Sequence, residues 1–451
     1  MSTTSITNGP LPDADAPIQP VIAQERLKSW WHTPTTLTVF GLIALIGFGI
    51  LAPGGSWDST LHIATDRDLL AVPDIAVPAQ LTSVILAVVC LVIAGVTWWL
   101  AFRYPVVRPA LRATLLVLFG IFWVLSFLVW IVVGQTLDLT ALLQSTLALA
   151  VPLVFGSLSG VLSERAGVVN IAIEGQLLFG AFGAAILASM TGNPWLGIIA
   201  APIMALVIGV LLALFAVGYH VQQIIVGVVL NVLAIGLTSF FFSTVMKAHP
   251  EMLNTPTRLP NLPIPGLSHI PLIGPVLFNQ NILVYLMYVI VVVLTVALYR
   301  TRWGLRVRAV GEHPLAADTV GINVSRTRWS NVLLGSAVAG LGGATLTIGT
   351  GVAFGEEMSA GKGYIALAAM ILGRYNPIGA VCAALFFAFA DALQLRLGIL
   401  KTVAVPDGLD KFTLPGEFLL MLPYIVTLFA VAGFVGRVRV PAADGEPYIK
   451  Q

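Results

Sequence analysis

The sequence contains few charged residues. Asp, Glu, Lys and Arg together make up 10% of its 451 residues, whereas an average soluble protein carries about 25%. Hydrophobic residues make up 58% of the chain, and the mean hydropathy is +0.95. Because a soluble fold needs polar side chains over most of its surface, this composition disfavours soluble enzymes, nucleic-acid-binding proteins and disulfide scaffolds.

Residues that carry catalytic or metal chemistry are also scarce. The two cysteines, Cys90 and Cys382, lie inside apolar runs, where they are predicted to be small buried hydrophobic residues rather than a disulfide or a metal site. The six histidines are scattered. A phosphate-binding loop of the form Gly-x-x-x-x-Gly-Lys-Ser/Thr is absent, since the nearest segment, GEEMSAGKG, has the wrong spacing and Gly363 in place of a hydroxyl residue. We therefore predict no enzyme activity, no metal and no cofactor on this chain.

Long apolar runs are abundant. About 20 mostly apolar residues are needed to cross a bilayer as a helix. The sequence therefore predicts an all-α polytopic membrane protein with about 10 to 12 transmembrane helices, because the run 364–372 is too short to cross alone. The predicted spans are 36–52, 79–102, 113–134, 141–163, 171–190, 195–218, 224–246, 282–299, 331–350, 364–372, 378–397 and 418–435.

The basic residues predict the orientation. If the N-terminus is inside and all spans cross, 16 of the 23 lysines and arginines fall on the inner side, where such residues are retained. We therefore expect both termini to be cytoplasmic. Residues 1–33, which are polar and rich in proline, are predicted to be a disordered cytoplasmic arm, and residues 437–451 a cytoplasmic tail.

The character of the spans changes along the chain. Residues 34–134 form ordinary N-terminal transmembrane segments, whereas residues 135–436 form a core in which glycines cluster and polar residues enter the apolar runs. Two stretches, 152–183 and 334–379, are rich in glycine or proline. Such paired interruptions in two halves indicate broken or re-entrant helices around a transport pathway built from pseudo-repeated halves. Close helix packing through small residues is the alternative explanation.

The polar loop 300–330 contains six arginines and only two acidic residues. Pro314 suits the first turn of a helix, and Gly321 suits the position just past its end. The pattern predicts a helix of about two turns on the membrane surface, with Glu312 near its positive end. Three residues are predicted to be available for docking: Leu315, Ala316 and Val320. The alternative is an ordinary re-entry loop with a surface helix.

Three polar residues inside apolar runs are candidates for the wall of a substrate pathway: Asn170, Glu174 and Asn231. A carboxylate in a membrane is costly unless it is paired or faces a polar cavity. The favoured alternative for Glu174 is a structural anchor, paired with Arg165 or with freed backbone N–H groups at a broken helix. Asn231 could equally join two helices.

Three segments resemble a known family. GEHPLAADTVGINV (311–324), LSERAGVVNIAIEGQLLFGAF (162–182) and GKGYIALAAMILGRYNPIGAV (361–381) are similar to motifs of the ABC importer permeases that serve simple sugars, nucleosides and branched-chain amino acids. The second segment is similar to the nucleoside-type branch. Thr319 departs from the pattern, which has an aromatic residue there.

The resemblance implies a permease subunit that translocates nucleosides, or simple sugars, by alternating access in a bacterial plasma (inner) membrane. It implies cytoplasmic ATPase partners that hold ATP and Mg²⁺, a second homologous permease in a heteromer, and a substrate-binding lipoprotein or periplasmic protein. It also implies that the ATPase couples to the permease through Gly311, Glu312, Pro314, Ala316, Ala317, Gly321 and Ile322.

An ion-coupled secondary transporter of a small polar solute is the alternative function. Ion coupling usually requires acidic residues inside the membrane. Only Glu174 and Asp391 are candidates for that role, and the arginine-rich loop would have no obvious task in such a protein.

Overall fold

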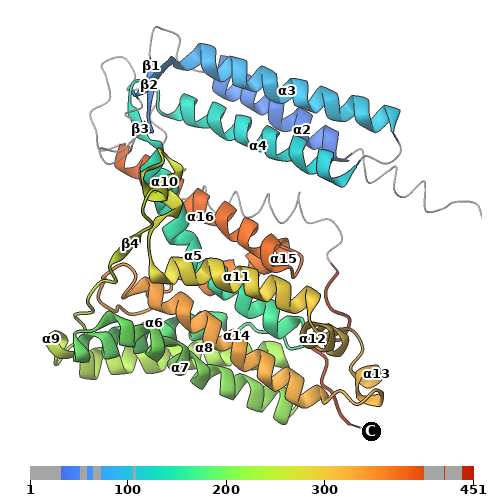
Figure 1. The fold of residues 1–451 in the computed structure, drawn as a ribbon, viewed down its shortest axis with the longest axis vertical. Coiled ribbons are helices and arrows are strands. Elements are labelled where there is room, and N and C mark those ends of the chain that lie inside the picture. The colour runs from blue at the N-terminus through green and yellow to red at the C-terminus, as the bar shows by residue number, and fades with distance from the viewer. Residues whose placement is uncertain are drawn as a thin grey trace, which may run out of the picture. The chain divides into compact units, whose positions relative to one another are not determined.

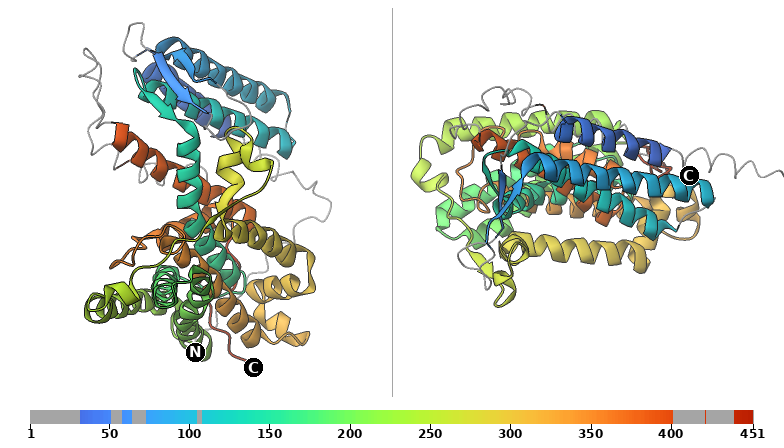
Figure 2. Two further views of the ribbon diagram at one scale, coloured as in Figure 1. Left: turned by 60° about the vertical axis from the view of Figure 1, so that its left-hand side comes forward. Right: turned by 90° about the horizontal axis from the view of Figure 1, so that it is seen from above.

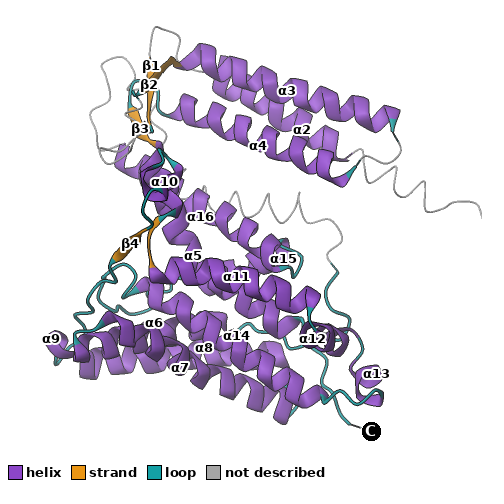
Figure 3. Ribbon diagram, in the orientation of Figure 1, coloured by secondary structure: helices purple, strands orange, loops and turns teal. Residues whose placement is uncertain are grey.

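The computed structural model describes residues 32–50, 58–63, 73–104, 108–400, 421 and 439–450. Within these residues the chain is built mainly from long helices, with a few short strands (Figures 1 and 3). The predicted arm 1–33 and the predicted span 418–435 lie outside the described residues, apart from His32, Thr33 and Met421. The described chain divides into two compact units.

The first unit contains the described residues of 32–61 and 75–137. Aromatic side chains hold its helices together: Trp123 packs edge-on against Phe40 and Phe48, and its indole N–H donates to the Phe40 carbonyl at 3.0 Å. Its strands form a three-stranded sheet in the order β2-β1-β3, in which β1 and β2 are antiparallel. The elements are α2 (His32–Ile43), the π-helix η1 (Ala44–Ile50), β1 (Asp58–His62), β2 (Ile75–Pro78), α3 (Ala79–Arg103), α4 (Pro109–Ile131) and β3 (Thr136–Asp138).

The second unit contains the remaining long helices. They are α5 (Leu139–Glu164), α6 (Ile173–Thr191), α7 (Pro194–Ala213) with η2 (Leu214–Gly218), α8 (Gln223–Phe241) with η3 (Phe242–Met246), α11 (Ile282–Arg300), α14 (Val324–Leu346), α15 (Lys362–Leu372) and α16 (Pro377–Leu400). In α5 and α6, 83% and 78% of the most apolar 18-residue window is buried, against 28% in α11. Helices α5 and α6 therefore form the centre of this unit.

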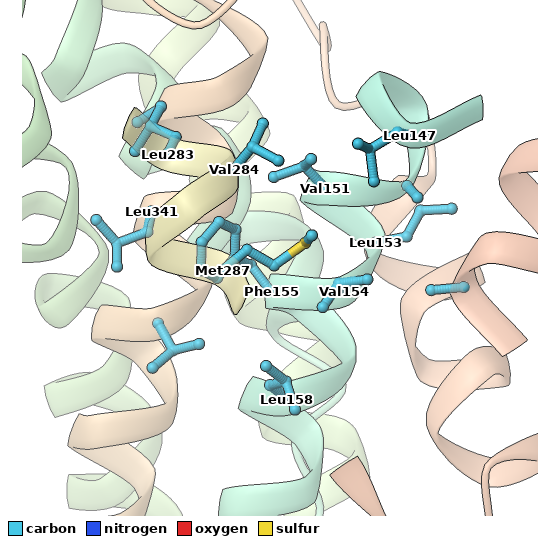
Figure 4. Close-up of a cluster of buried hydrophobic side chains, with 14 of the residues drawn as sticks. Leu147, Val151, Leu153, Val154, Phe155, Leu158, Leu283, Val284, Met287 and Leu341 are labelled. Atoms are coloured by element: carbon cyan, nitrogen blue, oxygen red, sulfur yellow. The ribbon is translucent and has the colours of Figure 1, made fainter. Parts of the chain in front are cut away.

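The largest apolar cluster of the second unit surrounds α5 (Figure 4). Val151 and Phe155 from α5 pack with Met287 from α11 and Leu341 from α14. Where helices cross more closely, glycine replaces such side chains: a Cβ at Gly180 of α6 would lie 2.5 Å from the Gly340 carbonyl of α14. Close packing therefore accounts for some of the glycines in the two glycine-rich stretches.

Short elements lie at the ends of these helices. Helix α9 lies at one end of the second unit and α12 and α13 at the opposite end (Figure 1), and Figure 2 gives two further views. Strands β4 and β5 pair antiparallel. The short elements are α9 (Pro250–Leu253), β4 (Asn261–Pro263), the 3-10 helix η4 (Leu267–His269), α10 (Ile273–Leu277), β5 (Asn279–Asn281), α12 (Arg302–Glu312) and α13 (Pro314–Thr319).

The predicted all-α polytopic fold is confirmed. Within the described residues, nine helical segments are long and apolar enough to cross a membrane, and α15 is too short, as predicted. The predicted span 331–350 corresponds to α14, which begins earlier, at Val324; its first two turns contain arginines and serines and were therefore left out of the predicted span. Helix α14 is not among the nine segments.

The predicted burial is correct for Cys90 and wrong for Cys382, which is exposed on α16. An apolar run in a spanning helix does not distinguish the side chains that face protein from those that face outward, because both faces are apolar in a membrane protein.

Candidate functional site

Each of the two glycine-rich stretches contains the end of one helix and the start of the next. Helix α5 ends at Glu164 and α6 begins at Ile173. Helix α14 ends at Leu346, and α15 begins at Lys362 after an irregular segment. Gly167 and Gly361 adopt positive φ angles of 84° and 78° in these segments, a conformation that favours glycine.

Glu174 connects the two interruptions. Its Oε1 accepts hydrogen bonds from the Ser359 hydroxyl at 2.6 Å and the Gly361 N–H at 2.8 Å, and its Oε2 accepts from the Gly363 N–H at 2.5 Å. The side chain is only 4% exposed. It lies in the first turn of α6 and faces the first turn of α15, so the positive ends of two helix dipoles stabilise its negative charge. We name Glu174 and its three donors the Glu174 junction.

The junction depends on close backbone approach. A Cβ at Gly363 would collide with the backbone N and Cα of Glu174. The Arg165 side chain does not supply the counter-charge, because its Nε donates instead to the Tyr375 carbonyl at 2.9 Å. The bonds of Glu174 therefore go to a serine and to the freed backbone N–H groups of a broken helix.

Asn231 of α8 makes hydrogen bonds to the start of α6 and to the residues just before it. Its Oδ1 accepts from the Gly175 N–H at 2.9 Å, and its Nδ2 donates to the Ile171 carbonyl at 2.8 Å and to the Tyr364 hydroxyl at 3.1 Å. Asn231 is 1% exposed, whereas Tyr364 is 48% exposed. Asn231 thus links α6, α8 and α15.

Asn170, in the connection between α5 and α6, belongs to a buried polar network. Its Nδ2 donates to Ser159 Oγ and to Gln176 Oε1, and Gln176 Nε2 donates back to Asn170 Oδ1, each at 3.2 Å. The structure therefore gathers Asn170, Glu174 and Asn231 around one break and gives each of them protein partners. Contact of these residues with substrate stays a prediction.

Sequence reasoning did not identify Ser359 and Tyr364 as parts of this site. Tyr364 lies within the motif-bearing segment 361–381, so its position in that segment was an available signal. Ser359 lies two residues before the segment, and no pattern marks it.

The predicted short helix is present in the arginine-rich loop. Helix α13 begins at Pro314 and ends at Thr319. Gly321 adopts a φ of 84°, and its N–H donates to the Asp318 carbonyl at 2.9 Å, which ends the helix. The Ile322 N–H closes the turn by donating to the Ala317 carbonyl at 3.0 Å. We call residues 311–322, through which the family resemblance implies contact with an ATPase, the coupling segment.

Glu312 is the last residue of α12 and stands two residues before Pro314, so it lies near the N-terminal end of α13. Helix α12 was not predicted because its arginines obscured an apolar face. Val307 and Val310 are buried on that face, three residues apart, and this helical spacing was the signal that could have revealed α12.

The residues of the coupling segment point in two directions. Leu315 and Val320 are 53% and 75% exposed, and Ala316 is also exposed. Ala317 is 3% exposed, and a Cβ at Gly311 would collide with the Arg165 carbonyl. Gly311 and Ala317 therefore face the protein and cannot themselves form an outer docking surface.

A groove of about 950 Å³ lies between α12, the turn after α13 and the start of α14. Apolar and basic side chains line it together, from α12, from the turn after α13 and from the first turns of α14. They include Arg302, Leu305, Arg306, Val320 and Arg326.

Comparison with known proteins identifies relatives of this chain. Residues 142–431 match the family described as the branched-chain amino acid transport system permease component. The chain is 37% identical over 323 residues to the guanosine ABC transporter permease protein NupQ of Bacillus subtilis, covering 69% of this chain and 97% of NupQ.

Two further relatives align over a similar length. The nucleoside ABC transporter permease protein NupC of Lactococcus lactis is 37% identical, covering 69% of this chain and 98% of NupC. The putative glucose ABC transporter permease protein TsgC13 of Haloferax volcanii is 32% identical, with the same two coverages of 69% and 98%. No solved structure matches the chain. Because the family match covers more than half of the sequence, the chain belongs to the permease component family of the branched-chain amino acid transport system.

Proposed function

We propose that this chain is the permease subunit of an ATP-driven ABC importer that carries nucleosides by alternating access. The observation that carries the proposal is the exposed apolar surface formed by Leu315 of α13 and by Val320, the residue that follows this helix, in a chain that belongs to an ABC permease family. The guanosine and nucleoside permeases aligned over 97% and 98% of their own lengths support the nucleoside as cargo.

The arginines support a cytoplasmic position for α13. Six arginines lie between residues 300 and 328, and basic residues beside spans are retained in the cytoplasm. The exposed side of α13 would then face the compartment that holds ATP. Leu315, Ala316 and Val320 would dock a separate ATPase subunit, which would bind ATP and Mg²⁺.

The packing supports a route for the motion. Helix α13 is joined to α11 through α12 and to α14 through residues 320–323. Helix α14 packs against α5, α6 and α7, and α6 carries Glu174. Displacement of α13 by the ATPase would tilt α14 and shift the Glu174 junction, in the manner of a two-state element biased from a distance.

The remaining partners are part of the same proposal. NupB, from the same organism as NupC, is 24% identical to this chain. NupP, from the same organism as NupQ, is 23% identical to it. Such pairs support a second, homologous permease beside this one. A substrate-binding lipoprotein or periplasmic protein would deliver the nucleoside. The assembly would lie in a bacterial plasma membrane, with both termini of this chain in the cytoplasm.

Uptake of labelled guanosine by the reconstituted complex tests the proposal. Replacing Leu315 and Val320 together by Asp should lower ATP-driven uptake at least tenfold, because charges on the docking surface prevent apolar contact, while insertion and folding stay normal. The matched control is Met252→Asp, which changes an apolar residue that is 56% exposed in α9, at the opposite end.

Two outcomes would contradict the proposal. Full ATP-driven uptake by the double variant would show that α13 is not the coupling surface. Uptake driven by an ion gradient without any ATPase would instead identify the chain as an ion-coupled transporter.

A further inference from the structure

The segment Arg439–Lys450 lies against the end of the second unit that carries α12 and α13 (Figure 1). It forms turns rather than a helix or strand, yet Pro441, Ala443 and Tyr448 are buried. We name this segment the strap.

The strap is attached to the coupling segment. The Ala443 N–H donates to the Gly311 carbonyl at 2.9 Å, and the Ala442 N–H donates to Glu312 Oε2 at 3.4 Å. Tyr448 packs in one apolar cluster with Val310 of α12 and Ala317 of α13. The buried side of the coupling segment is therefore covered by the strap.

The strap is also attached to the core of the second unit through Arg328 of α14. The Arg328 side chain is 1% exposed. Its Nη1 donates to the Glu446 carbonyl at 2.7 Å, and its Nη2 donates to the Ala443 carbonyl at 3.4 Å. A buried guanidinium left without acceptors is strongly destabilising, so Arg328 requires the strap backbone to be in place.

Two further contacts fix the strap in position. His220, between α7 and α8, places its Nε2 2.9 Å from the Tyr448 carbonyl oxygen. The Asp444 carboxyl lies against the carboxyl of Glu164 at the end of α5, and each of them has a buried oxygen without a donor among the described residues. The strap thus contacts four elements of the core and coupling region: α5, the α7–α8 connection, α12–α13 and α14.

Helix α13 makes few buried contacts of its own, whereas α12 already packs at the end of α5, where Val307 clusters with Val161 and Ala166. Helix α13 has six residues, and Ala317 is the one among them that is buried. Isolated helices of this length are unstable in water, so the position of α13 must come from its neighbours. An ATPase that displaced an unsecured α13 would move the loop alone.

We propose that the strap is a positioning element for ATP coupling, which holds α12 and α13 against α5 and α14 so that displacement of the coupling segment reaches the broken helices. The inference rests on the proposed function and identifies Arg328 as the positioning residue. The strap touches neither the exposed side of α13 nor the Glu174 junction in the described contacts, so it acts between them.

The test compares Arg328→Met with Glu446→Gln in the reconstituted importer. Arg328→Met removes both bonds to the strap, whereas Glu446→Gln changes an exposed side chain and leaves both hydrogen bonds of Arg328 in place. Arg328→Met should lower the number of guanosine molecules imported per ATP hydrolysed about tenfold while ATP hydrolysis continues. Hydrogen exchange of the strap peptide should accelerate, and Glu446→Gln should change neither quantity.

A second variant tests the proposal in case the first one does not fold. If Arg328→Met does not fold, Tyr448→Ser loosens the same attachment without burying an unpaired charge and should give the same uncoupling. An unchanged ratio of transport to hydrolysis, together with faster exchange of the strap, would overturn the proposal. Failure of the proposed function would appear separately, as the absence of ATP-driven uptake in the unmutated complex.

Discussion

Two buried glutamates lie on either side of the break between α5 and α6, and they are stabilised in opposite ways. Glu174 accepts three hydrogen bonds from a serine and two backbone N–H groups. Glu164 lies against another carboxyl, that of Asp444, and its backbone donor within the described chain is the single N–H of Asn170. Both side chains are almost fully buried, at 4% and 3% exposure, so the difference lies in their partners and not in their burial.

The contact of Glu174 with its donors needs no extra proton, whereas the contact between Glu164 and Asp444 depends on one. A carboxylate that accepts from N–H donors binds them most strongly when it is ionised. Two carboxyl groups can share a hydrogen bond only while one of them is protonated. The Glu174 junction should therefore behave as a permanent part of the fold, and the contact between Glu164 and the strap as a weaker, pH-dependent attachment.

Glu174→Ala is expected to have the largest effect. It removes three charge-assisted bonds and leaves two backbone N–H groups of α15 unpaired, which should cost roughly 4 kcal/mol of unfolding free energy. Unfolding of the purified chain in mixed micelles measures the loss. The control, Glu251→Ala, changes an exposed glutamate of α9 and should cause no loss. Equal stability of the two variants would show that the Glu174 junction is not a structural contact.

Asn231→Leu is expected to have an intermediate effect. It preserves volume but leaves the buried Gly175 N–H without its acceptor, and single hydrogen bonds within membrane proteins contribute up to about 1.7 kcal/mol. The same unfolding measurement should show a loss of about 1–2 kcal/mol. Tyr364→Phe, which removes only one of the Asn231 partners, should lose less; a larger loss for Tyr364→Phe would refute this ranking.

Raising the pH should loosen the strap. Burial raises the pKa of Asp444 to about 7, although the bond with Glu164 and the charge of Arg328 oppose this rise. The groups that face Asp444 or its partners are Glu164, Arg165, Arg328, Tyr375 and Glu446. Because the attached state binds the extra proton, attachment is strongest below about pH 4 and weakens as the pH rises to about 7.

Hydrogen exchange of the strap peptide, corrected for the intrinsic pH dependence of exchange, measures this loosening. Protection should fall several-fold between pH 5 and pH 8 in the unmutated protein, and should be independent of pH in Asp444→Asn. A pH dependence of equal size in Asp444→Asn would place the titrating group elsewhere.

Glu164→Gln should have the smallest effect. Its amide N–H can donate to an ionised Asp444, so the bond survives without a shared proton. We expect an unfolding free energy within about 1 kcal/mol of the unmutated protein and a strap that stays protected at pH 8. A loss as large as that of Glu174→Ala would remove the contrast between the two glutamates.

The long helices could be predicted from the sequence because each consists of about 20 apolar residues, and spanning helices satisfy their own backbone groups. Helix α13 could be predicted because Pro314 and Gly321 mark its two ends through backbone geometry. In both cases the signal is local, and the structure follows from residues within a few turns of each other.

The partners within the site could not be predicted. Glu174 meets Ser359, Gly361 and Gly363 across more than 180 residues, and two of these three donors are backbone groups that have no side-chain signal. The strap is a similar case, because Arg328 binds carbonyl oxygens that every residue possesses. Arg328 itself stands one turn inside α14, and an arginine that close to an apolar run was the available hint of a buried partner.

The position of the strap in the chain has a consequence for biogenesis. A ribosome completes domains from the N-terminal side, at about 5–20 residues per second, so every described helix is synthesised before residue 439. The Glu174 junction needs nothing beyond Gly363 and can form while synthesis continues. The coupling segment, by contrast, acquires its attachment only once residues 439–450 have been synthesised, so a newly inserted permease forms the Glu174 junction before the strap is in place.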